Sequence, residues 1–67
     1  MLRFYFSLEG NQNVDDRFGL AFENELQAFV AAQRLANDIA SAQPALRGTT
    51  WVVVTRKDRD EAYYVSI

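Results

Sequence analysis

The sequence predicts an α+β fold of order ββαββ, in which an antiparallel four-stranded sheet carries one helix packed on one face. Three observations support this prediction. Apolar and polar residues alternate in short segments at both ends of the chain, and one alanine-rich helical segment lies between them. The length of 67 residues gives room for a single α+β domain over residues 1–67. Two local hairpins joined by one crossover helix favour antiparallel pairing.

The first two strands are predicted from alternation. Residues 3–8 alternate between apolar and polar side chains, which is typical of a half-buried strand. After a loop over residues 9–17, residues 18–22 alternate again and predict a short strand that pairs back on the first. The core side chains expected from these strands are Phe4, Phe6, Leu8, Phe18, Leu20 and Phe22.

The helix is predicted to run from Glu25 to Ala42. Asn24 is the expected N-cap, with Gln27 placed three residues later as in a capping box, and Pro44 ends the helix. The apolar arc of this helix is wider than contact with one sheet requires. Its members are Leu26, Phe29, Val30, Ala32, Leu35, Ala36, Ile39 and Ala40.

The last two strands are predicted over residues 50–55 and 62–67, joined by a charged turn over residues 56–61. An even number of turn residues would place Trp51 and Val53 on the same face as Tyr64. An odd number is favoured here, because it unites five large residues under the helix. These are Trp51, Val53, Tyr63, Val65 and Ile67.

With that parity, the opposite face of the sheet is more apolar than a lone domain requires. We expect this face to be a dimer or partner surface. Its residues are Tyr5, Ala21, Val52, Val54 and Tyr64.

Composition excludes several kinds of protein. The net charge of −2 and the pI near 4.8 argue against nucleic-acid binding, which needs a clustered basic face. Cys and His are both absent, so we expect no disulfide, no structural metal site and no cofactor. The chain has no apolar run of membrane-spanning length and no early signal-peptide pattern, which makes the cytoplasm the expected location.

Candidate chemical sites are few, and an enzyme is not expected. Five acidic residues could bind a hard cation, but solvated turns explain them better: Asp15, Asp16, Asp58, Asp60 and Glu61. Tyr5, Tyr63 and Tyr64 could stack on bases, although packing within or between sheets is the favoured explanation. The serines have no visible base near them in the sequence.

The order of several short motifs resembles a known family. These motifs are Arg3-Phe4-Tyr5-Phe6, Asp16 to Gly19 followed by Leu20, the alanine-rich helix, Trp51 with Val53, and Tyr64-Val65-Ser66-Ile67. The chain resembles a family of short bacterial proteins, common in rhizobia and their relatives, that is classed as a domain of unknown function. It departs from the family pattern at Arg59, where a turn glycine is usual. The resemblance implies a fold and no activity.

The leading hypothesis is a small non-enzymatic protein-interaction module that forms a homodimer, with another protein as a possible partner. The small size, the second apolar sheet face and the wide apolar arc of the helix favour it. The alternative is a small nucleic-acid-associated regulatory protein, which rests on analogy between compact folds. A third hypothesis, an enzymatic or small-molecule-binding domain, requires an enclosed polar pocket.

Overall fold

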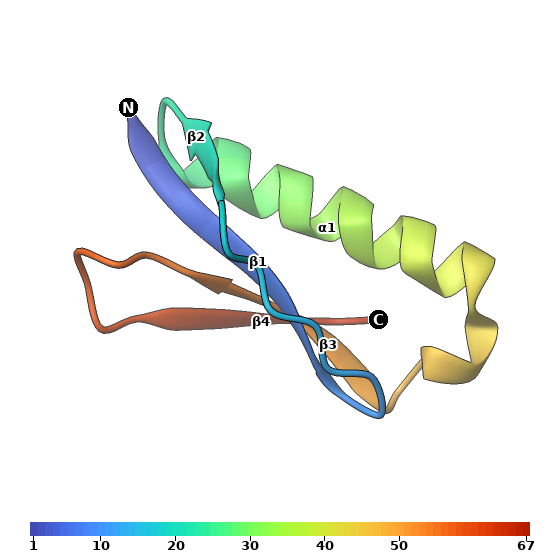
Figure 1. Cartoon of the computed structure of the whole chain (residues 1–67). Coiled ribbons are helices and arrows are strands. Elements are labelled where there is room, and N and C mark those ends of the chain that lie inside the picture. Colours follow the sequence, from blue (N-terminus) through green and yellow to red (C-terminus); the bar gives the residue numbers. More distant parts are fainter.

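The computed structural model of the chain describes all 67 residues and confirms the α+β prediction (Figure 1). Its sheet has four antiparallel strands in the order β2-β1-β3-β4, and the single long helix packs on one face. The elements are β1 (Leu2–Gly10), β2 (Leu20–Phe22), α1 (Glu25–Ala42), the short 3-10 helix η1 (Pro44–Leu46), β3 (Thr50–Thr55) and β4 (Ala62–Ser66).

The sheet is organised around β1, which changes partner on its way through the molecule. Its first residues, Leu2 to Phe4, pair with β2, and the rest, from Tyr5 to Gly10, pair with β3 on the other side. The pairing of β1 with β2 and of β3 with β4 confirms the two hairpins predicted from the sequence. The central pair, β1 with β3, joins the two hairpins into one sheet.

The second strand is shorter than predicted, because its first two residues belong to a turn. Phe18 and Gly19 direct their backbone N–H groups to the side chain of Asp16, so they do not pair with β1. Phe18 is 82% exposed, and the prediction that it lies in the core is wrong. Leu20 points to the helix side but is also largely exposed, because β2 is the outer strand at this edge.

The predicted helix bounds and N-cap are confirmed. The Asn24 side chain accepts a hydrogen bond from the backbone N–H of Gln27 at 2.9 Å. The Gln27 side chain in turn accepts from the N–H of Glu23, the residue before the N-cap, at 3.0 Å, so one unpaired donor of the first helical turn and one donor just before the helix are satisfied. Gln43 closes the helix, and Pro44 begins the 3-10 turn that leads to β3.

A seam of three alanines brings α1 close to the sheet. Ala28, Ala32 and Ala36 are spaced four residues apart, lie on one side of the helix, and are fully or almost fully buried. The larger apolar residues of the predicted arc are distributed differently. Phe29 contacts Tyr63 with ring centroids 4.7 Å apart, whereas Leu26 and Val30 remain exposed.

The prediction about the last turn is wrong, and the structure follows the even alternative. Thr55 pairs with Ala62, so the turn holds residues 56–61. Val52 therefore lies between Leu8 and Val65 under the helix, and Trp51 points to the opposite face. No residue other than glycine has a positive φ, so the turn accommodates a non-glycine residue at position 59 without left-handed geometry.

The face that β3 turns to the helix has a physical reason. Because the alanine seam brings α1 close to the sheet, the space above β3 suits the short, branched side chains of Val52 and Val54, both 0% exposed. The large indole of Trp51 does not fit there. The predictions that Trp51 and Val53 belong to the core under the helix are therefore wrong, as is the assignment of Val52 and Val54 to the surface.

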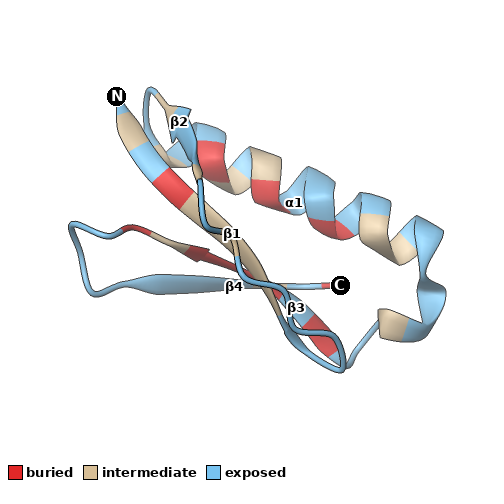
Figure 2. Cartoon of the chain, in the orientation of Figure 1, coloured by how far each residue is buried: buried red, intermediate tan, exposed pale blue.

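The resulting core is small, and Figure 2 shows its buried residues as short segments of α1, β1 and β3, while most of β4 is exposed. Half-buried neighbours, among them Phe6, Leu8, Phe22 and Val65, pack around it. The rings of Phe4 and Phe22 meet edge to face, with centroids 6.0 Å apart. The residues of this core are Phe4, Ala28, Ala32, Ala36, Val52, Val54 and Ile67, and Val53 is buried on the opposite face of the sheet.

The burial of Val52 gives a first testable prediction. Val52→Arg should unfold the chain, because an unpaired charge under the helix costs more than about 4 kcal/mol, much of the stability of so small a domain. Circular dichroism and a proton–nitrogen NMR spectrum would measure this loss. Thr55→Arg, a change on the opposite face of the same strand, should leave the fold intact. A folded Val52→Arg protein would contradict the placement of Val52.

Candidate interaction surface

The sheet surface that faces away from α1, here called the open face, is the principal candidate surface. Residues of each strand point alternately to the two faces, so those that alternate with Phe4, Phe6, Val52 and Val54 lie on it. Figure 1 shows α1 on one side of the sheet only. The residues of the open face are Arg3, Tyr5, Ser7, Glu9, Ala21, Trp51, Val53, Thr55, Ala62, Tyr64 and Ser66.

Of the five residues predicted for a partner surface, the structure places three on the open face. Tyr5, Ala21 and Tyr64 lie there, whereas Val52 and Val54 are buried under the helix. Trp51 replaces them as the large side chain of this surface. The sequence offered a signal for Trp51, since the even-parity alternative joins it to Tyr64.

Aromatic side chains dominate the open face on the side of β3 and β4. Val53 is only 2% exposed, because Ser7 and Tyr64 flank it in the same row of the sheet. Tyr64 is 62% exposed and Trp51 is 38% exposed. A partner that covers this face would therefore contact two accessible aromatic rings, while the buried Val53 beside them offers almost no surface.

Charges on the open face are few and stand apart from one another. Arg3 and Glu9 lie at opposite ends of β1, and the Arg3 guanidinium donates to the carbonyl of Phe18 at 2.7 Å. The Lys57 ammonium sits 5.1 Å from the centre of the Tyr5 ring, within the range of a cation–π contact. The open face thus carries two cations and one anion, although the whole chain has a net charge of −2.

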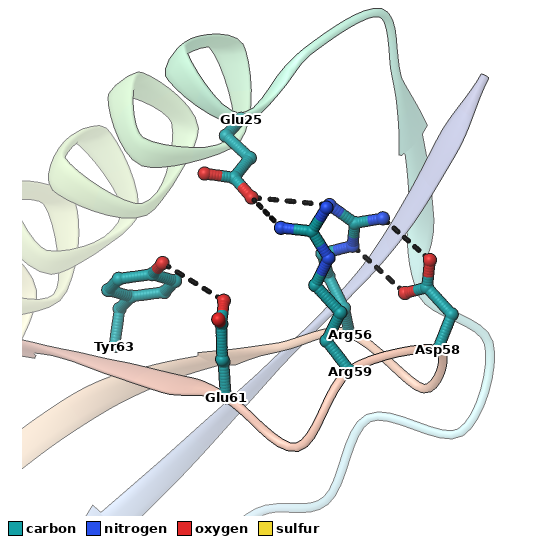
Figure 3. Close-up of polar contacts among 6 residues, drawn as sticks. All are labelled: Glu25, Arg56, Asp58, Arg59, Glu61 and Tyr63. Atoms are coloured by element: carbon teal, nitrogen blue, oxygen red, sulfur yellow. Dashed lines mark hydrogen bonds and ion pairs between the residues drawn. The ribbon is translucent and has the colours of Figure 1, made fainter.

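The charged turn between β3 and β4 is occupied by internal contacts (Figure 3). The Arg56 guanidinium donates to both carboxylate oxygens of Asp58, at 2.9 and 2.6 Å, and to Glu25 at 3.2 Å. It also lies 5.5 Å from the centre of the Phe4 ring, and Arg59 reaches the same Glu25 oxygen at 3.5 Å. The turn is therefore tied to the start of α1.

These contacts also change the acid–base behaviour of the turn. The hydrogen bonds and charge of Arg56 lower the pKa of Asp58, and the same hydrogen bonds raise the pKa of Arg56. Both groups therefore remain charged over a wide pH range. Because Arg56 is nine-tenths buried and already paired, it is not available to bind a phosphate or an acidic partner.

Tyr63 belongs to the helix side of the sheet, unlike Tyr5 and Tyr64. Its ring packs against Phe29, and its hydroxyl donates to a carboxylate oxygen of Glu61 at 3.3 Å (Figure 3). The negative charge of Glu61 is the main reason why the pKa of Tyr63 is raised. The three tyrosines considered in the sequence therefore do not form one stacking platform.

Asp16 closes the outer edge of β1 beyond the short strand β2. Its carboxylate accepts from the backbone N–H of Phe6, a donor of β1 that β2 does not reach, and from those of Phe18 and Gly19, each at 3.0 Å. Gly19 has φ +69°, and a Cβ there would meet the Phe4 carbonyl at 2.8 Å. The segment from Asp16 to Gly19 therefore pairs with backbone groups of β1 and of its own turn, and it is not a solvated turn.

The remaining surfaces offer little that would support chemistry. An open groove of about 470 Å³ follows the flank of α1 beside β2, and it is lined by Phe22, Gln27, Val30, Ala31, Arg34, Leu35 and Asp38. No three acidic side chains gather closely enough to hold a metal ion. The chain also contains no helix with the length and apolar character needed to cross a membrane.

Comparison with known proteins gives one match. A family model described as "Domain of unknown function (DUF6894)" matches residues 3–67. No curated protein and no solved structure matches the chain. The matched residues include every strand and helix of the fold except the first residue of β1.

The contacts of Asp16 predict a dependence of stability on pH. Hydrogen bonds, that from Gly19 foremost, lower the pKa of Asp16 below its ordinary value of 3.8. Its contribution to stability is therefore complete above 3.8 and is lost as the pH falls from there through the lower folded-state pKa. Asp16→Asn should unfold at a lower urea concentration than the wild type at pH 7.

The difference between the two proteins at pH 7 should shrink when the urea midpoints are measured at a pH below 3.8, because protonation then neutralises a growing fraction of the Asp16 side chains. Asp15→Asn, a change at the exposed neighbouring carboxylate, provides the matched control and should leave the urea midpoint nearly unchanged. An equal loss at both pH values for Asp16→Asn would contradict a role for the carboxylate charge.

Proposed function

The chain belongs to the DUF6894 family of domains of unknown function, and we propose that it is a small non-enzymatic protein-interaction module that acts as a homodimer in the cytoplasm. The open face is the surface that this module presents for contact. The proposal rests chiefly on one observation, namely the imbalance between the apolar side chains that the fold buries and those that it leaves exposed.

The core of one chain is small for the apolar content of the sequence. Eight hydrophobic residues are buried, and three of these are alanines. Ten large hydrophobic residues, including Trp51 and Tyr64, remain more than a third exposed. Domains of this length bury only about 60% of their unfolded surface, so further burial between chains would add stability that the isolated core lacks.

Two of the ten exposed residues lie together on the open face and support association there. Trp51 and Tyr64 gather on the open face and at its β4 edge, with small neighbours such as Ser66 and Ala62 that leave their rings accessible. Exposed aromatic rings surrounded by small residues are typical of contact surfaces between proteins.

A non-enzymatic role is supported by the residues that the chain contains. It has neither His nor Cys, the side chains that most often serve as general bases and nucleophiles. The groups with shifted pKa are held in structural contacts: Asp16 with the backbone at the β1 edge, Asp58 with Arg56, and Tyr63 with Glu61. A lack of cysteine also suits a reducing compartment such as the cytoplasm.

The homodimer is tested by the mass of the native protein. Analytical ultracentrifugation at micromolar concentration should show a species of twice the 7.7 kDa mass of one chain. Dilution to nanomolar concentration should shift the equilibrium toward the single chain. A mass of 7.7 kDa at every concentration up to about 1 mM would overturn the dimer.

A second candidate function, binding of single-stranded nucleic acid, is favoured by one specific observation. Tyr5, Trp51 and Tyr64 share the open face with the cations Arg3 and Lys57, a combination of rings and positive charge on which bases could stack. The net charge of the chain opposes it, so this candidate ranks below protein interaction.

The single tryptophan makes this second candidate easy to test. If bases stack on the open face, a thymidine oligonucleotide at low salt should quench the fluorescence of Trp51, and added salt should reverse the effect. Arg3→Glu should weaken that quenching, whereas Arg34→Glu, a change on the helix, should not. Unchanged Trp51 fluorescence at low salt would eliminate this candidate.

A further inference from the structure

The two edges of the sheet differ in how their backbone N–H and C=O groups find hydrogen-bond partners. On the β1 side, β2 pairs with the first residues of the strand, Asp16 accepts from Phe6, and Val14 exchanges two backbone hydrogen bonds with Leu8, at 2.9 and 3.1 Å. On the other side, β4 is the last strand, and no segment of the chain lies beyond it. The other outer strand, β2, has only three residues, so β4 is the longer free backbone edge of this molecule.

The register shows which groups of β4 are free. Ile67 donates to Thr50 at 3.1 Å, and because antiparallel ladders alternate, Val65 and Tyr63 also direct their backbone groups to β3. The N–H and C=O groups of the intervening residues point away from the sheet. These residues are Ala62, Tyr64 and Ser66.

The strand β4 lacks the features with which monomeric proteins block an exposed edge. Such edges usually carry a lysine, a proline, a bulge or an inward-pointing charge. The sequence of β4 is Ala-Tyr-Tyr-Val-Ser, which contains no charge and no proline, and its pairing with β3 runs without interruption from Ala62 to Ser66. A strand of this kind is a template for another strand.

We infer that a second copy of this chain occupies the edge, so that β4 pairs antiparallel with β4 of the partner and forms a continuous eight-stranded sheet. This inference rests on the proposed homodimer and specifies how its two chains meet. A two-fold axis midway between the two copies of Tyr64 places Tyr64 opposite its own copy and Ala62 opposite the partner's Ser66. All three outward-pointing residues then pair, giving about six backbone hydrogen bonds between the chains.

The side chains of β4 are self-complementary in this register. On the helix side, Tyr63 lies opposite the partner's Val65, so a 38% exposed ring covers a half-buried valine. On the open face, the two copies of Tyr64 meet side by side, with only Ala62 and Ser66 next to them. Like charges do not oppose each other within the paired segment, because β4 carries none. This self-complementarity favours a second copy over an unrelated partner.

The arrangement has a consequence for the open face. Antiparallel strands related by a two-fold axis perpendicular to their sheet keep the same face upward, so both helices lie on one side. The two open faces then join into one surface that carries Tyr5, Trp51 and Tyr64 twice. Dimerisation through β4 therefore leaves the aromatic surface free for a further partner, whereas stacking of two open faces would bury it.

Crosslinking through introduced cysteines separates these two arrangements, because the chain has no cysteine of its own. In the edge-paired dimer, Cα atoms at position 64 lie about 5.5 Å apart, and those at position 7 about 24 Å apart across five strand spacings. Tyr64→Cys should therefore be crosslinked to a dimer by a short bismaleimide, and Ser7→Cys should not. Stacked open faces, about 10 Å apart, should give efficient crosslinking of Ser7→Cys instead.

A charge at the edge supplies a second, independent test. Tyr64→Lys places two ammonium groups opposite each other and should raise the dimer dissociation constant about tenfold or more. Thr55→Lys, on the same open face but in β3, should leave the dissociation constant within about threefold of the wild-type value. Circular dichroism would confirm that both variants are folded before ultracentrifugation.

The outcomes distinguish this inference from the proposed function. A wild-type dimer that Tyr64→Lys does not weaken, or that crosslinks through Ser7→Cys and not through Tyr64→Cys, overturns pairing through β4 and leaves the homodimer standing. A wild-type protein that is a single chain at every concentration overturns both. Should Tyr64→Lys fail to fold, the crosslinking result for the two cysteine variants decides the question.

Discussion

The close approach of α1 to β3 is the constraint on which the rest of this structure depends. Three alanines at four-residue spacing let the helix lie against the sheet, and the shallow space between them takes Val52 and Val54. Once these valines face the helix, the alternation of the strand turns Trp51 and Val53 to the other side. The composition of the open face is therefore a consequence of helix packing.

A second constraint is that each strand edge must find hydrogen-bond partners. On the β1 side, the chain provides them itself through β2, Val14 and the carboxylate of Asp16. The lowered pKa of Asp16 reflects how strongly these backbone donors favour its charged form. On the β4 side the chain provides nothing, and water or another strand has to take that place. This asymmetry gives the molecule one edge that ends in the three-residue strand β2 and one longer free edge along β4, which suits pairwise association.

Polar contacts in this fold mainly hold structural elements in place relative to one another. The Arg56 guanidinium joins the β3–β4 turn to Glu25 at the start of α1 and lies over the Phe4 ring, so it links three elements that are distant in sequence. Tyr63 and Phe29 make a similar link between β4 and the helix. These contacts fix the hairpin against the helix, and they hold the free β4 edge and the aromatic rings of the open face in a defined orientation. A contact surface on rigid strands loses little conformational entropy on binding.

The sequence by itself determined the α+β class, the helix from Glu25 to Ala42 with its Asn24 cap, and the two hairpins, because alternation, capping and proline are local signals. It also predicted that Tyr5 and Tyr64 share one surface. Only the tertiary structure decided which face β3 turns to the helix. A change of one residue in the length of the β3–β4 turn moves every side chain of a strand to the other face, and the sequence of residues 56–61 contains no local signal that fixes this length. The exposure of Trp51, the burial of Val52 and Val54, and the hydrogen bond from the Phe6 N–H to Asp16 all depend on contacts between residues far apart in the chain.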